Sequence, residues 1–388
     1  MGRNIIVLGG GIGGLSTVRA LQERLNSSDK ITLIDRAATY VQGLSLLWLL
    51  RGWRQLDDVM VTGVKKALGD TELVRAEVSH IDLDDRRVYT ADGPLSYDAL
   101  VVALGAELNV DGVPGLAEAV STGAAVHYYT PEAAVDANRQ LRRMRSGRVV
   151  LLVSSLPYKC PAAPYEGAML VADLLTETGH RDSVEVQVYS PEPLPMPVAG
   201  PVVGAGVVSM LAEVGVDFHP GKQVERIDAT ANKILFADGE HVAFDLLVFI
   251  PPHRAPGAVA GLGLSPQGWI PVDGHSLASP APGMWALGDN ASITLVNGKP
   301  LPKAAVFAKG QSAAVSSGVA RHLGYDVPQV RFSGLGHCYL EVGGHRAARG
   351  EGDFYADGGP VVTLAGPSQE LHHEKEREEA SWLMQWNG

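Results

Sequence analysis

The chain has 388 residues, which is enough for two packed domains and a further segment. Hydrophobic residues make up 46% of it and charged residues 19%, so the composition excludes a disordered protein. The formal net charge of −11 argues against a polyanionic partner, and we expect no nucleic acid to bind. The opening residues lead directly into a β-type run and not into a secretory signal, which predicts a cytoplasmic location. No apolar run reaches eighteen residues, so a membrane-spanning helix is not expected.

The start of the chain predicts a strand, a glycine turn, a helix and a second strand. Residues 4–8 (NIIVL) have the pattern of a buried strand, and residues 30–34 have that of a second one. Between them, the apolar residues of 15–25 recur at helical spacing. Such a unit places the free amides and the positive dipole end of a helix beside the turn. The turn is therefore a candidate phosphate-binding site.

The turn has the pattern G-x-G-x-x-G through Gly9, Gly11 and Gly14. Gly9 permits a tight turn, Gly11 lets the backbone approach a pyrophosphate, and Gly14 lets the helix pack closely on the strand. Asp35 follows Gly14 by 21 residues, at the end of the second strand, where a carboxylate accepts bonds from ribose hydroxyls. The unit predicts a site for an adenine dinucleotide.

Further strand patterns divide the chain into domains. Residues 99–105 predict another strand beside the first two, and residues 148–153 begin a second strand–helix–strand unit that ends near 184–189. A further apolar strand at 244–250 is predicted to start the return to the first domain. We therefore expect a discontinuous first domain, an inserted second domain and a C-terminal cap, with the bounds 1–112 and 245–325, 113–244, and 326–388.

Two later segments favour FAD over NAD as the dinucleotide. Residues 99–107 (ALVVALGAE) resemble the second fingerprint of two-dinucleotide flavoproteins, a strand that passes behind the cofactor and ends in a small-residue turn. Residues 282–290 (PGMWALGDN) resemble their third, in which Asp289 would bond the ribityl chain. The residues of these segments that are expected at the cofactor are Ala103, Gly105, Gly288 and Asp289.

The second strand–helix–strand unit lacks a phosphate loop. Where glycines would stand, residues 153–167 read VSSLPYKCPAAPYEG. The bulky Leu156 and Tyr158 prevent close approach to a pyrophosphate, and Pro157 has no amide to donate. The second domain is therefore predicted to keep the plan of a nicotinamide-binding domain with a degenerate site, which disfavours NADH as electron donor.

The segment KCPAAPYE, which contains Cys160, resembles the signature of the sulfide:quinone oxidoreductase and flavocytochrome c sulfide dehydrogenase flavoprotein family. The segment GLGHCYLEVGG, which contains Cys338, matches the family's second cysteine, and FIPPHRAP and LPKAAVFAKGQ match further segments. The resemblance implies an α/β fold of two Rossmann-like domains with a C-terminal cap, in a glutathione-reductase-like architecture. It also implies that Cys160 and Cys338 form a redox-active disulfide beside the flavin.

This resemblance implies roles for a few side chains. Hydrosulfide attack on a disulfide gives a persulfide and a thiolate, and we expect Lys159 and the following helix start to lower the pKa of Cys160. Glu166 is a candidate proton-transfer group, or alternatively a carboxylate in the first turn of a helix. Lys303 precedes the helix that would point at the flavin pyrimidine. The alternative for the two cysteines is a pair of buried thiols that only pack.

The sequence departs from the family in two places. No cysteine occurs at 40–43, where flavocytochrome relatives attach the flavin, so we expect noncovalent FAD. None occurs at 125–132, where many relatives have a third cysteine, so growth of long polysulfide chains is not expected. The expected reaction is oxidation of sulfide or a small persulfide, with a quinone as acceptor. The alternatives are a cytochrome acceptor, an NAD(P)H-dependent disulfide or quinone reductase, and a non-catalytic flavin-binding sensor or assembly subunit.

The C-terminal segment is open to two interpretations. A charge run at 374–379 precedes Trp382 and Trp386. Tryptophans with apolar neighbours are typical of a membrane interface, which would make the protein peripheral on the inner face of the membrane. The acidic run favours instead a helix that caps the body or a second subunit of a homo-oligomer. The apolar residues 44–50 (LSLLWLL) have the composition either of a quinone channel or of core.

Overall fold

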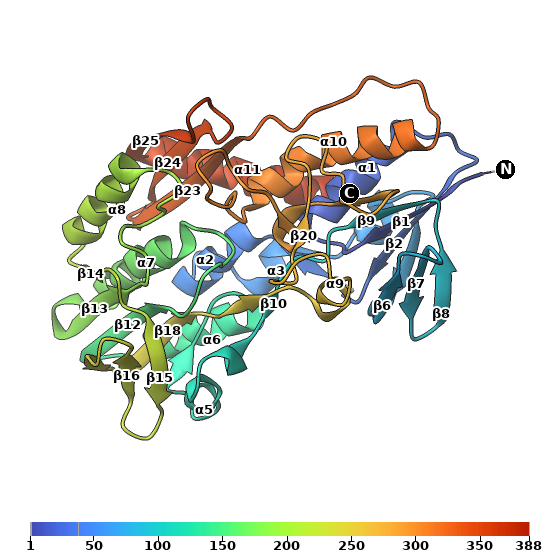
Figure 1. Cartoon of the computed structure of the whole chain (residues 1–388). Helices are drawn as coiled ribbons and strands as arrows, with labels where there is room; N and C mark the ends of the chain where they lie inside the picture. The colour runs from blue at the N-terminus through green and yellow to red at the C-terminus, as the bar shows by residue number, and fades with distance from the viewer. Residues whose placement is uncertain (1, 38, 388) are drawn as a thin grey trace.

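The computed structural model describes residues 2–37 and 39–387. A parallel sheet in the order β21-β9-β1-β2-β5 forms the first domain (Figure 1). The predicted strands 4–8, 30–34 and 99–105 are confirmed as three neighbours in it. The strands are β1 (Asn4–Leu8), β2 (Lys30–Asp35), β5 (Glu72–Arg75), β9 (Ala99–Val102) and β21 (Met284–Ala286).

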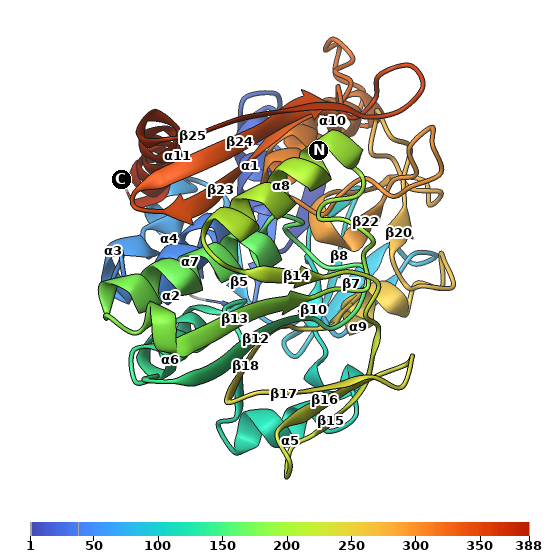
Figure 2. The same cartoon turned by 90° about the vertical axis from the view of Figure 1, so that its left-hand side faces the viewer.

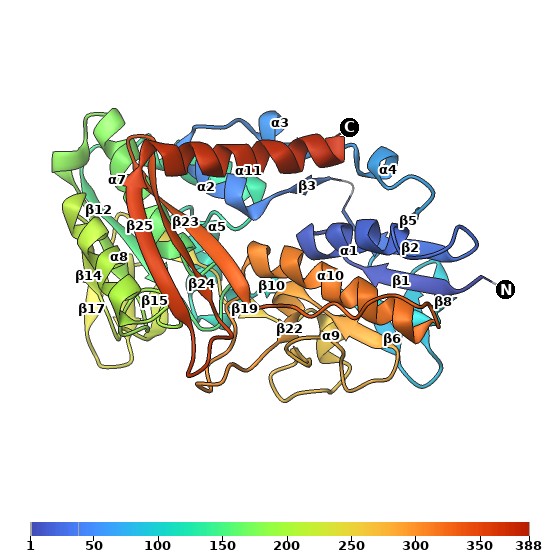
Figure 3. The ribbon, with the colours of Figure 1, turned by 90° about the horizontal axis from the view of Figure 1, so that it is seen from above.

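The first sheet is covered on both faces, and its buried inner residues are apolar apart from Thr32. Ile5 and Val7 of β1 pack toward helices α1 (Ile12–Gln22) and α10 (Ala305–His322), which lie side by side (Figure 3). Ile6 and Leu8 point to the other face and join a core with the antiparallel sheet β6-β7-β8. Its strands are β6 (His80–Asp82), β7 (Arg87–Thr90) and β8 (Gly93–Ser96). Successive residues of a strand point to opposite faces, which explains this division.

A second parallel sheet, in the order β11-β18-β12-β13-β14, forms the second domain. Helices α7 (Ala163–Glu177) and α8 (Pro201–Glu213) separate it from the C-terminal sheet, so three layers are stacked (Figure 2). A small antiparallel sheet and α5 (Leu116–Ser121) cover its other face. The parallel strands are β11 (Ala125–Val126), β12 (Gly147–Val153), β13 (Val184–Tyr189), β14 (Asp217–His219) and β18 (Leu246–Ile250), and the antiparallel ones are β15 (Val224–Asp228), β16 (Lys233–Phe236) and β17 (His241–Ala243).

The predicted boundary between the domains at residue 245 is wrong. Strand β18 pairs in parallel with β12 and β11, so it belongs to the second sheet and not to the first. The chain returns to the first domain only after Ile250, through β19 (His253–Arg254), which pairs with β10 (Glu107–Leu108). An entirely apolar strand fits the centre of either parallel sheet, so its composition did not distinguish them.

The C-terminal segment forms an antiparallel sheet and a long helix. Strands β23 (Leu335–Gly343), β24 (Arg346–Asp353) and β25 (Val361–Ser368) are followed by α11 (Gln369–Asn387), which crosses from this sheet to the first domain (Figure 3). Trp382 and Trp386 are 3% and 1% exposed. The interpretation of these tryptophans as a membrane contact is therefore wrong, because they already pack in the first domain's core. Across the described residues, no helix has both the length and the apolar character needed to span a membrane.

Shorter elements connect these layers. Helix α2 (Gly43–Arg51) comprises the apolar residues 44–50 and lies between the domains, against α6 (Pro131–Leu141) and α7. The remaining elements are β3 (Tyr40–Val41), α3 (Leu56–Val59), β4 (Met60–Val61), α4 (Val64–Ala67), α9 (Gly257–Ala260), β20 (Ile270–Pro271) and β22 (Ala291–Ser292), with 3₁₀ turns at Val110–Gly112, Arg181–Ser183 and Gly288–Asn290.

Candidate functional site

A cavity of about 1270 Å³ extends from the glycine turn after β1 to the two cysteines. Gly9, Gly11 and Asp35 line one end, and Cys160 and Cys338 line the other. The cavity therefore lies beyond the carboxyl ends of the parallel strands, where α/β sheets bind their ligands. Of the residues predicted to hold a dinucleotide, all but Gly14 line this cavity. The predicted residues that line it are Gly9, Gly11, Asp35, Ala103, Gly105, Gly288, Asp289 and Lys303.

The glycine turn has the geometry of a phosphate cradle. Gly9 has φ +99°, and a Cβ there would lie 2.2 Å from the carbonyl oxygen of Ala103. Gly14 lies in the first turn of α1, and a Cβ there would lie 1.8 Å from the carbonyl oxygen of Gly9. A Cβ on Gly11 would meet nothing closer than the ring of Tyr40 at 3.8 Å. Of the three glycines, Gly11 is therefore the one that packing within the fold requires least. The absence of a side chain at this position leaves room in the cavity.

We expect Gly11→Ala and Gly14→Ala to fail in different ways. Gly11→Ala should fold with an unchanged thermal midpoint in the apoprotein but bind FAD at least about tenfold more weakly, because the methyl group occupies the approach of the pyrophosphate. Gly14→Ala should lower the midpoint itself, because its methyl group overlaps the Gly9 carbonyl. Flavin fluorescence titration and thermal unfolding measure the two effects. Wild-type FAD affinity in Gly11→Ala would contradict this placement of the pyrophosphate.

Asp35 is held at the edge of the cavity by backbone amides. The amide of Gly10 donates to its Oδ2 at 2.5 Å, and the amide of Ala37 donates to its Oδ1 at 2.6 Å. Each carboxylate oxygen can accept more than one bond. The carboxylate is therefore oriented by the turn itself, with further capacity for ribose hydroxyls.

The segments around Gly105 and Asp289 are joined by a buried asparagine that sequence reasoning missed. Asn290 is fully buried, accepts a bond from the Gly105 amide at 3.1 Å and donates to the Val102 carbonyl at 3.1 Å. The buried Gln311 of α10 accepts from the amide of Gly288 at 2.8 Å. These bonds fix both turns against the cavity. The only sequence signal was that Asn290 directly follows Asp289.

Lys303 links the cofactor end of the cavity to the cysteine end. Its Nζ donates to the carbonyl oxygens of Asp289 at 2.5 Å and Ala291 at 3.2 Å, and lies 3.8 Å from the ring centre of Trp269. Burial lowers its pKa to about 8. Its own carbonyl accepts from the Cys160 amide at 2.7 Å. Helix α10 begins two residues later with no acidic residue in its first turn, so its positive end faces the cavity uncompensated.

The two cysteines are free thiols in the wall of the same cavity. Cys160 has φ +61° and stands directly before the start of α7, where its carbonyl accepts from the amide of Ala163 at 3.0 Å. Cys338 lies on β23. Burial raises the pKa of Cys338 above its usual range, and the neighbouring Cys160 raises it further. The fold therefore places both thiols in the wall of one cavity.

The expectation that the pKa of Cys160 is lowered is wrong. Burial, reinforced by the charge of Glu166, raises the pKa of this thiol to about 11. Lys375 and the amides at the start of α7 lower it, but less. The Nζ of Lys159 lies 5.8 Å from the ring centre of Tyr129. The amides at the start of α7 lower the pKa of Cys160 as expected, but the lysine that lowers it is Lys375.

Glu166 belongs to a buried charged cluster that the sequence did not reveal. Its carboxylate pairs with Lys375 of α11, and the Nζ of Lys375 is also 3.7 Å from Glu341 of β23. All three side chains are 3% exposed or less. Burial raises the pKa of Glu166 to about 7, against the opposing charge of Lys375. A carboxyl group with this pKa, beside Cys160 and in the cavity wall, is suited to accept and release a proton near neutral pH.

Two family models match parts of this chain. Residues 3–151 match the pyridine nucleotide-disulphide oxidoreductase family, and residues 136–251 match the central part of the flavoprotein chain of sulfide dehydrogenase (flavocytochrome c). The N-terminal part of the chain is therefore similar to the pyridine nucleotide-disulphide oxidoreductases. Its central part is similar to the sulfide dehydrogenase flavoproteins.

Individual relatives extend the similarity over most of the chain. The sulfide-quinone reductase of Aquifex aeolicus is 26% identical over 68% of this chain, and the match spans 61% of that protein. The mitochondrial sulfide:quinone oxidoreductase of Mus musculus is 21% identical over 93% of this chain and 80% of its own length. The solved structure of the Aquifex aeolicus sulfide:quinone oxidoreductase superposes with a TM-score of 0.86 at 21% identity, over 99% of this chain and 91% of that one. The last match supports the fold.

The segment that stands in place of a second glycine loop packs against a buried carboxylate after β13. Glu192, which is 5% exposed and follows β13, accepts bonds from the hydroxyls of Tyr158 at 2.8 Å and Tyr165 at 2.6 Å. A carboxylate at this point of a Rossmann-like unit would otherwise bind ribose hydroxyls. The two tyrosines belong to the segment 153–167 that replaces the glycine loop. This arrangement supports the prediction that the nicotinamide site is degenerate.

His253 does not take part in the site. Its Nδ1 lies 2.7 Å from the carbonyl oxygen of Pro251, and burial lowers its pKa to about 3. The imidazole therefore stays neutral at physiological pH. It is also absent from the described residues that line the cavity.

Proposed function

We propose that this flavoprotein oxidises sulfide, or a small persulfide, through a redox pair formed by Cys160 and Cys338. The observation that carries the proposal is the continuous cavity, which joins a dinucleotide cradle to both thiols and to the buried Glu166. FAD, when bound, supplies a two-electron acceptor beside the thiols. It would be held noncovalently by Gly9, Gly11, Gly14, Asp35, Ala103, Gly105, Gly288, Asp289 and Lys303.

The sulfur step begins with the two cysteines as a disulfide. Hydrosulfide attacks one sulfur, the S–S bond breaks, and a persulfide and a thiolate result. The better leaving thiolate is the one with the lower pKa. Lys375 and the amides at the start of α7 lower the pKa of Cys160 against the effect of its burial, so they would stabilise its thiolate. Hydrosulfide therefore attacks Cys338, which keeps the persulfide, and Cys160 leaves as the thiolate.

Glu166 and Lys375 manage the charge of this step. The thiolate of Cys160 carries a negative charge within the field of Lys375, which stabilises it. Glu166 has a pKa of about 7, so both of its protonation states are accessible near neutral pH. When protonated it can give a proton to the thiolate, and when ionised it can accept one from incoming hydrogen sulfide. The start of α10 and Lys303 place positive potential at the cofactor end of the cavity, where electrons from the sulfur would arrive.

A quinone is the proposed electron acceptor. Three leucines of α2, namely Leu44, Leu46 and Leu47, line the cavity and give it an apolar wall, whereas Trp48 and Leu50 of the same helix are core. Apolar walls with a few polar groups are typical of sites for such ligands. The match of residues 136–251 to the flavocytochrome c flavoprotein chain favours a cytochrome as the second candidate acceptor.

Anaerobic flavin titration tests the proposal. We expect sulfide to bleach the flavin absorbance within the mixing time and NADH to leave it unchanged, because the second dinucleotide site is filled by Tyr158 and Tyr165. A water-soluble short-chain quinone should then restore the absorbance faster than cytochrome c does. Bleaching by NADH without bleaching by sulfide would overturn the proposal, and faster reoxidation by the cytochrome would replace the quinone as acceptor.

A further inference from the structure

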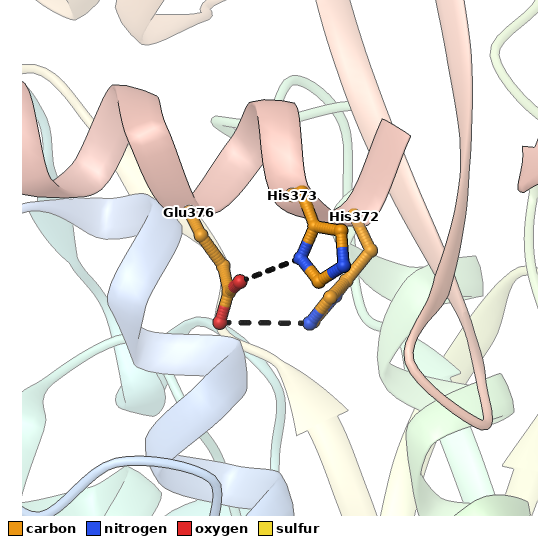
Figure 4. A group of neighbouring side chains, drawn as sticks. All are labelled: His372, His373 and Glu376. Carbon is orange, nitrogen blue, oxygen red and sulfur yellow. Dashed lines mark hydrogen bonds and ion pairs between the residues drawn. The ribbon is translucent and has the colours of Figure 1, made fainter. Parts of the chain in front are cut away.

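Three side chains of the kinds that bind metal ions gather near the start of α11 (Figure 4). They are His372, His373 and Glu376, and their ligand atoms all lie within 4.8 Å of one another. The Nε2 of His372 is 3.6 Å from one carboxylate oxygen of Glu376, and the Nδ1 of His373 is 3.0 Å from the other. Ligand atoms at 2.0 to 2.2 Å around a tetrahedral zinc ion are separated by about 3.3 to 3.6 Å. The two observed contacts, which are to different oxygens of Glu376, are 3.6 and 3.0 Å long, so small side-chain movements would bring the three groups to this spacing.

His372 is oriented as a metal ligand by a buried carboxylate. Its side chain is 3% exposed, and its Nδ1 lies 2.9 Å and 3.0 Å from the two oxygens of Glu341, which has no exposed surface. A carboxylate can only accept, so Nδ1 carries a hydrogen in this contact, and Nε2 is the ring nitrogen that faces Glu376. Metal-bound histidines are commonly held in this way, with the other ring nitrogen bonded to a carboxylate.

The Nε2 of His372 faces two further groups that can bind a cation. Glu376 offers a carboxylate, and the Nδ1 of His345, from the turn between β23 and β24, is 3.2 Å from the same Nε2. The ring of His345 is fixed by stacking on Trp53 with ring centres 4.4 Å apart. A proton or a metal ion between these groups would give each of them a bonding partner. The four side chains come from two segments, so a metal ion there would tie the turn to α11.

The neighbouring cation does not fill the site. Arg54 donates to Glu376 at 3.3 Å, but its shorter bond, at 2.8 Å, is to Glu379. It can therefore keep Glu379 as a partner when the carboxylate of Glu376 turns to an ion. The site is also open to solvent, because the side chains of His373 and Glu376 are 55% and 35% exposed.

We propose that His372, His373 and Glu376 bind a divalent transition-metal ion of the zinc class, with His345 beside them from the turn. Two imidazole nitrogens and a carboxylate suit zinc, with a water molecule in the remaining position. None of the three α11 residues is among the described residues that line the cavity of the cysteines. The proposal is therefore independent of the proposed sulfur chemistry.

Zinc titration of the untagged, FAD-loaded protein tests the proposal. Because thiols also bind zinc, the titration uses the double variant Cys160→Ser/Cys338→Ser. A chromogenic chelator that competes for the ion reports how tightly the protein binds it. We expect one zinc per chain, and at least tenfold weaker binding in His373→Ala and in Glu376→Gln. Both changes are at exposed or half-exposed positions, so the fold should persist. A thermal midpoint that rises with zinc only when both residues are present gives a second readout.

Matched controls are a second exposed histidine and a second exposed glutamate. His241→Ala, on β17, and Glu370→Gln, at the start of α11, should bind zinc like their parent. Cobalt(II) in place of zinc should give a visible spectrum without thiolate charge-transfer bands, as expected for nitrogen and oxygen ligands. Stoichiometric binding that survives the change of His373 and of Glu376, or no binding at all, would overturn the proposal.

Discussion

Cys160→Ser and Cys338→Ser are each expected to reduce the rate of sulfide-driven flavin reduction by about 10³-fold or more while FAD stays bound. Serine has nearly the shape of cysteine but forms neither a disulfide nor a persulfide. Both side chains line the cavity at the end remote from the glycine turn, so the cofactor cradle is not disturbed. Stopped-flow absorbance under anaerobic conditions measures the rate, and the visible spectrum of each variant measures its FAD content.

The two cysteine variants also test which sulfur is attacked. If hydrosulfide attacks Cys338, then an intact protein stopped after one turnover should carry the extra sulfur on the peptide that contains Cys338. Tyr158→Phe is the matched control, because it changes the same loop as Cys160 without removing a thiol, and its rate should equal that of the wild type. Rates in both cysteine variants within threefold of the wild type would remove the pair from the mechanism.

Lys375→Met is expected to cost about 3 to 5 kcal/mol of unfolding free energy, because it leaves the buried carboxylates of Glu166 and Glu341 without their shared cation. Loss of this charge also raises the pKa of Glu166 and of the Cys160 thiol, since Lys375 lowers both. The variant should therefore be unstable and also slow to form the Cys160 thiolate. Urea unfolding of the FAD-loaded protein measures the first effect, and the alkylation rate of reduced Cys160 at pH 8 measures the second.

A second substitution separates the lost cation from lost packing. In Glu166→Gln/Lys375→Met one of the two uncompensated carboxylates is gone, so the double variant should be more stable than Lys375→Met alone. Arg377→Met is the control on the same helix, because its pair with Glu370 is exposed, and its urea midpoint should not change. A Lys375→Met variant as stable as the wild type would mean that the cluster is neutral and not an ion pair.

The cofactor half of the site follows from short-range sequence patterns. Gly9, Gly11, Gly14 and Asp35 fall within one strand–turn–helix–strand unit, whose geometry is fixed by local spacing. The structure places this unit at the cavity as the pattern predicts. The degenerate loop at 153–167 is equally local, because bulky residues and prolines exclude a phosphate turn wherever the rest of the chain lies.

The charged half of the site could not be predicted in this way. Lys375 and Glu166 are 209 residues apart, and nothing in the charged run 374–379 marks Lys375 and Glu379 as its buried members. The predicted lowering of the Cys160 pKa was wrong for the same reason. The shift depends on how deeply the thiol is buried and on which charges lie beside it, and both are decided by tertiary packing.

What the sequence by itself determined was the dinucleotide unit, the two-domain α/β plan and the loss of a nicotinamide loop, because each depends on residues that are close along the chain. Only the tertiary structure decided that β18 belongs to the second sheet, that Trp382 and Trp386 are core, and that both cysteines line one cavity with Glu166. An apolar strand or an amphipathic helix is compatible with several partners, and long-range packing selects among them. The electrostatics of the thiols follows from that selection, because charge energies depend on burial and on distances in space.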